Sequence, residues 1–172
     1  MKSIREVPAA ELKGKHILVR AGFDVPLTSS GEVADLFRVR RSAETIAYLA
    51  SVGARVIILS HIGRDPEETN APVARALKNE VPLTYVQDLT GPVAHAARDA
   101  MRDGDVLLLE NLRRDPREIK NDEEFAQELA SLGDLYVGDA FSAAHREHAS
   151  IVGVPKFLPH YSGLLVDAEV RD

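Results

Sequence analysis

Short runs of aliphatic residues recur along the chain and constrain its fold more than any other feature. They are nearly continuous and do not alternate polar with apolar residues, so both faces of each strand should be covered. Strands of this kind are typical of parallel sheets. The runs predict strands at "HILVR" (16–20), "RVIILS" (55–60), "LTYV" (83–86), "DVLLLE" (105–110) and "LYV" (135–137).

Segments with helical signals lie between these runs. One helical segment is expected over 42–49, where Ile46 and Leu49 are three residues apart. Asn70 is placed as an N-cap for "APVARAL", and Asn121 and Asp122 can cap "EEFAQELASL". Further helices are expected in "PVAHAARDAM" and in the tail from Ser162. This alternation predicts an α/β fold with a doubly wound, Rossmann-like parallel sheet, helices on both faces in three layers, and right-handed crossovers. We expect residues 1–172 to form one domain.

Composition and charge exclude several classes of function. The formal net charge is −6 and the calculated pI is about 5.5, which argues against nucleic acid as a partner because its binding needs a broad basic face. The chain has no cysteine, so disulfides and thiolate metal sites are ruled out. The apolar runs are too short to cross a bilayer, and the N-terminus lacks the apolar core of a signal peptide. We therefore expect a cytoplasmic protein with no membrane partner.

Positively charged residues follow four of the five predicted strands. Arg38 comes after the first, His61 and Arg64 after the second, Arg113 after the fourth and Arg146 after the fifth. In open α/β sheets, ligands bind beyond the carboxyl ends of the strands. A single arginine after a strand is ordinarily a solvated side chain or a salt-bridge partner. Four such loops in an acidic protein together predict a site for a phosphate or carboxylate anion.

The usual sequence motifs for metals and nucleotides are missing. No H-E-x-x-H spacing, no G-x-x-x-x-G-K-[ST] loop and no G-x-G-x-x-G run occurs. We therefore expect this chain to hold neither a metal ion nor a nucleotide by itself.

Several ordered stretches resemble one family. "LKGKHILVRAGFDVPL", "VIILSHIGR", "VLLLENLR", "GDAFSAAHREHASIVGVPKFLP" and "SGLLVDAEV" are similar, in order and spacing, to the N-terminal domain of phosphoglycerate kinase, from about Leu12 onward. The resemblance implies that this domain binds 3-phosphoglycerate or 1,3-bisphosphoglycerate. A separate C-terminal domain, absent from this chain, would bind Mg²⁺ and ADP or ATP. It also implies that the chain ends at the start of the helix joining the two domains.

The resemblance assigns roles to the positively charged residues. The resemblance implies that the substrate is bound by Arg38, His61, Arg64, Arg113 and Arg146. It also implies that Arg38 is the catalytic residue, which stabilises the transferring phosphoryl group. The other four would hold the glycerate carboxylate and the stationary phosphate. Such a site suits phosphoryl transfer, which depends on positioning and on neutralising charge.

Two departures from the family pattern fall inside the predicted site. The family usually reads "VDFNVP", whereas this chain reads "AGFDVP", so Gly22 replaces an aspartate and Asp24 replaces an asparagine. Asp24 either accepts the substrate hydroxyl or repels the substrate carboxylate. "AFGTAHR" also becomes "AFSAAHR".

Three readings of the chain follow from these observations. The leading one is the substrate half of a phosphoglycerate kinase, expected to be a monomer and inactive without the second domain. The second is a divergent, non-catalytic module that binds anions or regulates. In the third, the arginines form only intramolecular salt bridges.

Overall fold

The computed structural model describes all residues from Met1 to Asp172 and contains one six-stranded sheet. All strand pairs are parallel, and the strand order is β3-β4-β2-β1-β5-β6. In the register of the sheet, Ile17 lies opposite Val56 on one side and Leu135 on the other. The strands are β1 His16–Ala21, β2 Arg55–Leu59, β3 Thr84–Tyr85, β4 Val106–Leu108, β5 Leu135–Asp139 and β6 His160–Ser162.

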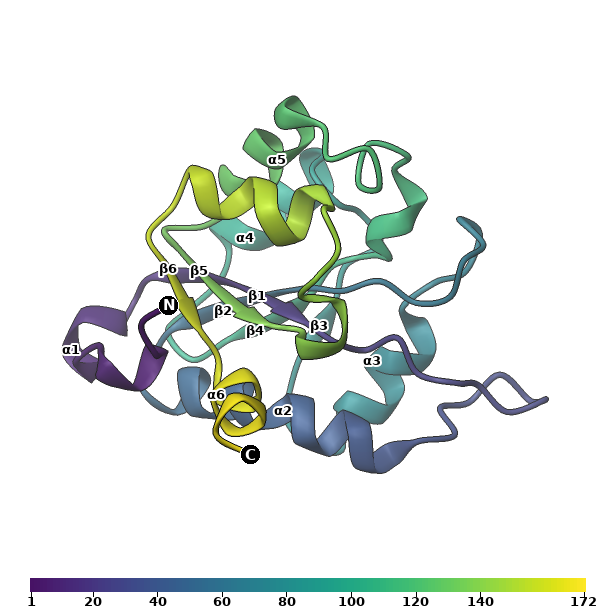
Figure 1. The fold of residues 1–172 in the computed structure, drawn as a ribbon, viewed down its shortest axis with the longest axis horizontal. Coiled ribbons are helices and arrows are strands. Elements are labelled where there is room, and N and C mark those ends of the chain that lie inside the picture. The colour runs from purple at the N-terminus through teal and green to yellow at the C-terminus, as the bar shows by residue number, and fades with distance from the viewer.

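Helices cover both faces of this sheet (Figure 1). They are α1 Ala9–Leu12, α2 Leu36–Ser51, α3 Ala71–Leu77, α4 Pro92–Asp99, α5 Glu123–Ala130 and α6 Leu164–Arg171. In Figure 1, α4 and α5 lie above the sheet, whereas α2, α3 and α6 lie below it. Short helical turns occupy Ile4–Glu6, Leu112–Arg114, Phe141–Ala143, Ala149–Gly153 and Val154–Lys156. None of the helices has both the length and the apolar character needed to span a membrane.

The core divides into two apolar clusters, one on each face of the sheet. Ile17 and Val19 of β1 belong to the cluster under α2 and α3, whereas Leu18 belongs to the cluster under α4 and α5. Neighbouring strand residues point to opposite faces, so a nearly continuous aliphatic run is what a strand covered on both faces requires. The predicted three-layer α/β fold is therefore confirmed.

Asn70 and Asp122 both occupy N-cap positions, as predicted, but only one of them caps its helix with its side chain. The Asp122 carboxylate accepts a hydrogen bond of 2.8 Å from the Phe125 backbone N–H. Asn70 precedes α3, but its side chain does not cap the helix. Its buried amide instead donates to the carbonyls of Ser60 and Leu109, at 3.4 and 3.0 Å. Those carbonyls follow β2 and β4, and a buried carbonyl without a partner would be costly.

The predicted elements differ from the observed ones mainly at the C-terminus and in length. The pattern did not predict β6, because "HYS" is not an aliphatic run. This strand pairs with β5, and Ser162 also forms an isolated parallel bridge with Ser3. The last helix begins at Leu164, not at Ser162, which belongs to β6. Helix α2 starts six residues before the predicted segment, where Asp35 accepts a hydrogen bond from the backbone N–H of Arg38.

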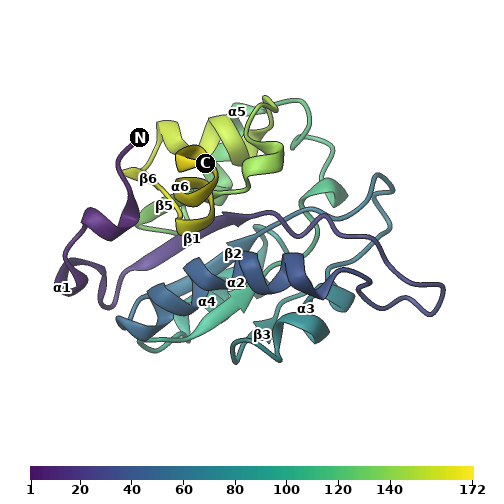
Figure 2. The ribbon, with the colours of Figure 1, turned by 60° about the horizontal axis from the view of Figure 1, so that its bottom comes forward.

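The strand order brings four loops to one edge of the sheet. Strands β4, β2, β1 and β5 are adjacent and parallel, so their carboxyl ends lie side by side. The chain leaves β1 toward β2 but places β5 on the other side of β1, which makes the gap between β1 and β5 a topological switch point. The long connection from β1 to α2 projects beyond this edge (Figure 2).

Candidate functional site

Asp24, His61 and Gly63 are joined by hydrogen bonds at the carboxyl ends of β1 and β2. The Asp24 carboxylate accepts from the Gly63 backbone N–H at 2.9 Å, and its other oxygen lies 3.3 Å from His61 Nε2. The Gly63 carbonyl accepts a hydrogen bond of 2.8 Å from the guanidinium of Arg113, in the loop after β4. Three of the four cation-bearing loops are thus in direct contact.

Arg20, near the end of β1, determines which nitrogen of the His61 ring carries the proton. Its guanidinium lies 2.7 Å from His61 Nδ1. Arginine can only donate, so Nδ1 accepts and the ring proton is on Nε2, where it is directed to Asp24. Burial is the main cause that lowers the pKa of His61 to about 4, and the neighbouring Arg20 and Arg113 lower it further. His61 is therefore a neutral hydrogen-bond donor at pH 7.

Arg20 is fully buried and belongs to a polar network that sequence reasoning missed. Its Nε donates to the Ser150 hydroxyl at 2.8 Å, and that hydroxyl donates to the Glu118 carboxylate at 2.5 Å. The other Glu118 oxygen accepts from the Ser150 backbone N–H at 2.7 Å. Burial lowers the pKa of Arg20, and the Glu118 charge opposes that shift. The only signal in the sequence was a charged residue inside an otherwise aliphatic run.

Arg113, Arg146 and Arg64 form the positively charged part of the site. Burial lowers the pKa of Arg113, and the nearby Arg146 and Arg64 lower it further, whereas Asp24 raises it. Arg146 also lowers the pKa of His61. Arg64 is exposed, whereas Arg113 and Arg146 are partly buried. The structure therefore brings cations from the loops after β2, β4 and β5 within electrostatic reach of one another.

Arg38 lies at the margin of this cluster. It is in the first turn of α2, its side chain is 54% exposed, and its guanidinium donates to the Asp24 carbonyl at 3.2 Å. It also forms a weak ion pair of 3.7 Å with Asp35. Arg38 is thus tied to the β1 loop but has freedom to move toward a bound ligand.

Asn111 holds the β2 loop against the β4 loop. Its side-chain oxygen accepts from the backbone N–H groups of Ile62 and Arg113, both at 3.1 Å. Its side-chain nitrogen donates to the carbonyls of Ile62 and Glu68, at 3.1 and 2.9 Å. These four bonds use its whole hydrogen-bonding capacity, so Asn111 positions the loops and is not available to a ligand.

Gly63 adopts a backbone conformation that other residues avoid. Its φ is +64°, in the left-handed region, and the Glu68 carboxylate packs directly against its α-carbon. A β-carbon at this position would collide with that carboxylate. The glycine therefore allows the tight turn that presents both its N–H and its carbonyl to the site.

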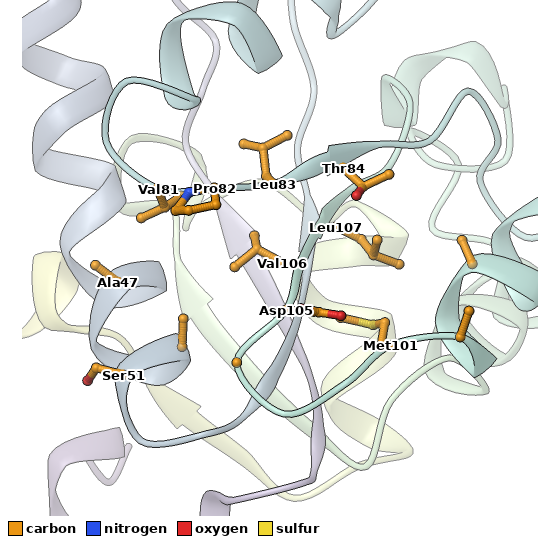
Figure 3. A pocket seen from close by; sticks show the side chains of 14 residues that line it. Ala47, Ser51, Val81, Pro82, Leu83, Thr84, Met101, Asp105, Val106 and Leu107 are labelled. Carbon is orange, nitrogen blue, oxygen red and sulfur yellow. The ribbon is translucent and has the colours of Figure 1, made fainter.

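Two cavities of the structure differ in volume and in the residues that line them. A cavity of about 320 Å³ adjoins the site and is lined by residues that include Gly22, Arg38, Ser142 and the buried Asp139. A larger one, of about 650 Å³, lies at the other edge of the sheet between the ends of α2 and α4, and is lined by Ser51, Leu83, Met101 and Leu107 among others (Figure 3). The larger cavity is lined by no cation. The smaller one shares Arg38 with the cluster described above, but His61, Arg113 and Arg146 do not line it, and carboxylates are part of its wall.

The salt bridges of the structure do not account for the cations. Arg64, Arg113 and Arg146 take part in none of them, whereas other arginines such as Arg55 and Arg117 are paired with carboxylates. Within the site, only Arg38 and His61 contact a carboxylate. No group of three or more histidine, aspartate or glutamate side chains is placed to hold a metal ion.

Comparison with known proteins matches this chain to one family. The family model for phosphoglycerate kinase matches residues 7–172. The chain belongs to the phosphoglycerate kinase family. It is 49% identical over 164 residues to a phosphoglycerate kinase of Herpetosiphon aurantiacus, covering 91% of this chain and 42% of that protein. It is 42% identical over 175 residues to one of Coprothermobacter proteolyticus, covering 98% of this chain and 44% of that protein.

Solved structures of phosphoglycerate kinases have the same fold. The enzyme from Pyrococcus horikoshii superposes with a TM-score of 0.90 at 27% identity, covering 99% of this chain and 44% of that one. The enzyme from Coxiella burnetii gives a TM-score of 0.87 at 32% identity, covering 98% and 43%. The chain thus spans less than half the length of the relatives that it matches.

Proposed function

We propose that this chain is the substrate-binding half of a phosphoglycerate kinase. It would hold 3-phosphoglycerate or 1,3-bisphosphoglycerate for phosphoryl transfer to or from a nucleotide bound by a second domain, as a step of glycolysis in the cytoplasm. The observation that carries this proposal is the convergence of Arg64, Arg113 and Arg146, none of which has a carboxylate partner, at the carboxyl ends of adjacent strands. Such unpaired guanidinium groups bind carboxylates and phosphates in bidentate geometry.

The geometry suggests a division of roles. Arg64, Arg113 and Arg146 would hold the stationary phosphate and the glycerate carboxylate, together with the Nε2–H of neutral His61. Asp24 can accept the substrate hydroxyl. Arg38, which is exposed and tied to the β1 loop, would turn toward the transferring phosphoryl group and neutralise the charge on its oxygens.

Mg²⁺ and ADP or ATP belong, in this proposal, to the second domain. The residues of this chain do not fit a metal site, because no cluster of three suitable ligands occurs. We propose that residues 1–172 are the N-terminal domain of a two-domain enzyme, that its last helix, α6, begins the connection between the domains, and that this chain alone is a monomer that binds substrate without turnover.

Calorimetric titration of the chain with 3-phosphoglycerate tests the proposal. We expect saturable binding, weakened about tenfold or more by Arg113→Gln. Arg55→Gln is the matched control, since Arg55 begins β2 at the opposite edge of the sheet and its loss removes the same charge. Absence of binding at millimolar ligand, or equal effects of the two variants, would contradict the proposal.

A non-catalytic anion-binding module is the second candidate. The hydrogen bonds of Asp24 to the site's own donors favour it, because they replace contacts that a substrate would make. The gene decides between the two: a reading frame that continues into a second α/β domain supports the enzyme, and a stop codon after Asp172 supports the module.

A further inference from the structure

The Asp24 carboxylate takes up the neutral donors of the proposed anion site. One oxygen accepts the Gly63 backbone N–H at 2.9 Å, and the other lies 3.3 Å from His61 Nε2. Because Arg20 occupies His61 Nδ1, the ring has its only proton on Nε2, and that proton is directed to Asp24. A side chain of the protein therefore occupies donors that could hold an oxygen of a ligand.

The backbone on either side keeps Asp24 in this place. Phe23 and Val25 are buried, and the Phe23 N–H donates to the Ser60 hydroxyl at 3.2 Å. The Asp24 side chain itself is 45% exposed, so it lies at the surface of the site. Displacing it costs two hydrogen bonds and brings its negative charge close to the ligand.

Positive charges outnumber negative ones around Asp24. Arg20 and Arg113 both act on the His61 ring that Asp24 contacts, and Arg113 is itself influenced by Asp24. Arg64 and Arg146 lie beyond them and have no carboxylate partner. Asp24 is therefore the carboxylate that contacts His61, while the Glu68 carboxylate packs against Gly63 without bonding to its N–H, and the three arginines have no carboxylate partner.

We propose that Asp24 determines specificity in this site, by acting as an internal anion that competes with a ligand carboxylate for His61 and Gly63. Each of its oxygens keeps a lone pair that can accept a ligand hydroxyl, so the residue favours a hydroxyl over a carboxylate at this position. This inference rests on the proposed function, because it takes the anion site to be a phosphoglycerate site.

Two ligands and two matched variants separate this effect from general charge. 3-Phosphoglycerate and glycerol 3-phosphate differ only in a carboxylate that the second compound replaces with a hydroxymethyl group. Asp24→Asn keeps an oxygen acceptor and removes the charge. Asp105→Asn is the control, because it makes the same change in net charge at the opposite edge of the sheet. Calorimetry at one fixed ionic strength measures all combinations.

We expect Asp24→Asn to tighten 3-phosphoglycerate binding about tenfold, glycerol 3-phosphate binding less than threefold, and Asp105→Asn to change neither by more than twofold. If the unaltered chain binds 3-phosphoglycerate and Asp24→Asn leaves its affinity unchanged or weaker, the inference is overturned and the proposed function remains. If only the Asp24→Asn variant binds, the inference holds and the unaltered chain is not a phosphoglycerate-binding domain. Equal tightening of both ligands overturns the inference, and binding by neither protein overturns both proposals.

Discussion

The buried network of Arg20, Ser150 and Glu118 predicts a large and non-additive effect on stability. Replacing Arg20 with methionine removes three hydrogen bonds, to Ser150, to the Ala21 carbonyl and to His61, and leaves the Glu118 charge buried without compensation. Arg20 and Glu118 form no direct ion pair, because the Ser150 hydroxyl bridges them, but they are the opposite charges of one buried network. Removing one of two such buried opposite charges typically costs about 3–5 kcal/mol. We therefore expect Arg20→Met to lower the free energy of unfolding by about 4 kcal/mol, a large share of the stability of a domain of this size.

The companion variant Glu118→Gln tests whether charge compensation is the cause. It leaves Arg20 charged and buried, and we expect it to cost about 2 kcal/mol or more. The double variant lacks both charges, so its cost should fall short of the sum of the single costs by about 2 kcal/mol. Arg55→Met is the control, because its partly exposed pair with Asp103 at 3.2 Å should contribute about 1 kcal/mol or less.

Urea unfolding of the four variants, followed by circular dichroism, provides these free energies. The reasoning would be refuted if Arg20→Met cost no more than Arg55→Met, or if the costs of Arg20→Met and Glu118→Gln simply added. A rise in the His61 pKa in Arg20→Met, measured by nuclear magnetic resonance, is a second expected result, since Arg20 is among the causes that lower it.

Four further predictions concern single groups. The His61 ring should stay neutral down to about pH 4 in a nuclear magnetic resonance titration, and a folded pKa near 6.5 would contradict this. Because the folded pKa lies below the unfolded value of 6.5, His61 contributes about 3 kcal/mol to the free energy of unfolding above pH 6.5. This contribution is lost as the pH falls through 4. Burial raises the pKa of Asp139 to about 6, so Asp139→Asn should increase the free energy of unfolding at pH 7 by up to about 3 kcal/mol. Urea unfolding should show this gain vanish below about pH 4, and a variant that is less stable at pH 7 would contradict the prediction. Gly63→Ala should lower the free energy of unfolding by about 2 kcal/mol or more, because φ is positive and the Glu68 carboxylate fills the space of the added methyl group. Adding Glu68→Ala should recover part of this loss. A cost below about 0.5 kcal/mol in thermal unfolding would contradict the prediction. In an enzyme that joins this chain to its nucleotide domain, Arg38→Ala should lower kcat about tenfold or more with a smaller change in KM, and steady-state kinetics with equal changes in both would remove its catalytic role.

The sequence predicted which residues lie at the strand ends better than it predicted which of them contact one another. The strand ends and the positions of the arginines after the strands could both be predicted from local patterns. The partners of these residues could not, because Arg20 meets Ser150 across 130 residues of sequence and His61 across 41. Nothing in the local pattern distinguishes Glu118, which compensates Arg20, from a solvated carboxylate.

The class of fold was determined by the sequence alone, because burial on both faces requires continuous aliphatic strands and the intervening helices need one apolar face each. The tertiary structure decided which polar groups meet at the edge of the sheet. It buried Arg20 beside Glu118, turned Asn70 from a helix cap into a link between two strand ends, and directed Asp24 to His61 and Gly63. The physical reason is that periodic burial follows from neighbours in sequence, whereas hydrogen bonds and charge compensation depend on distant residues brought together by the strand order.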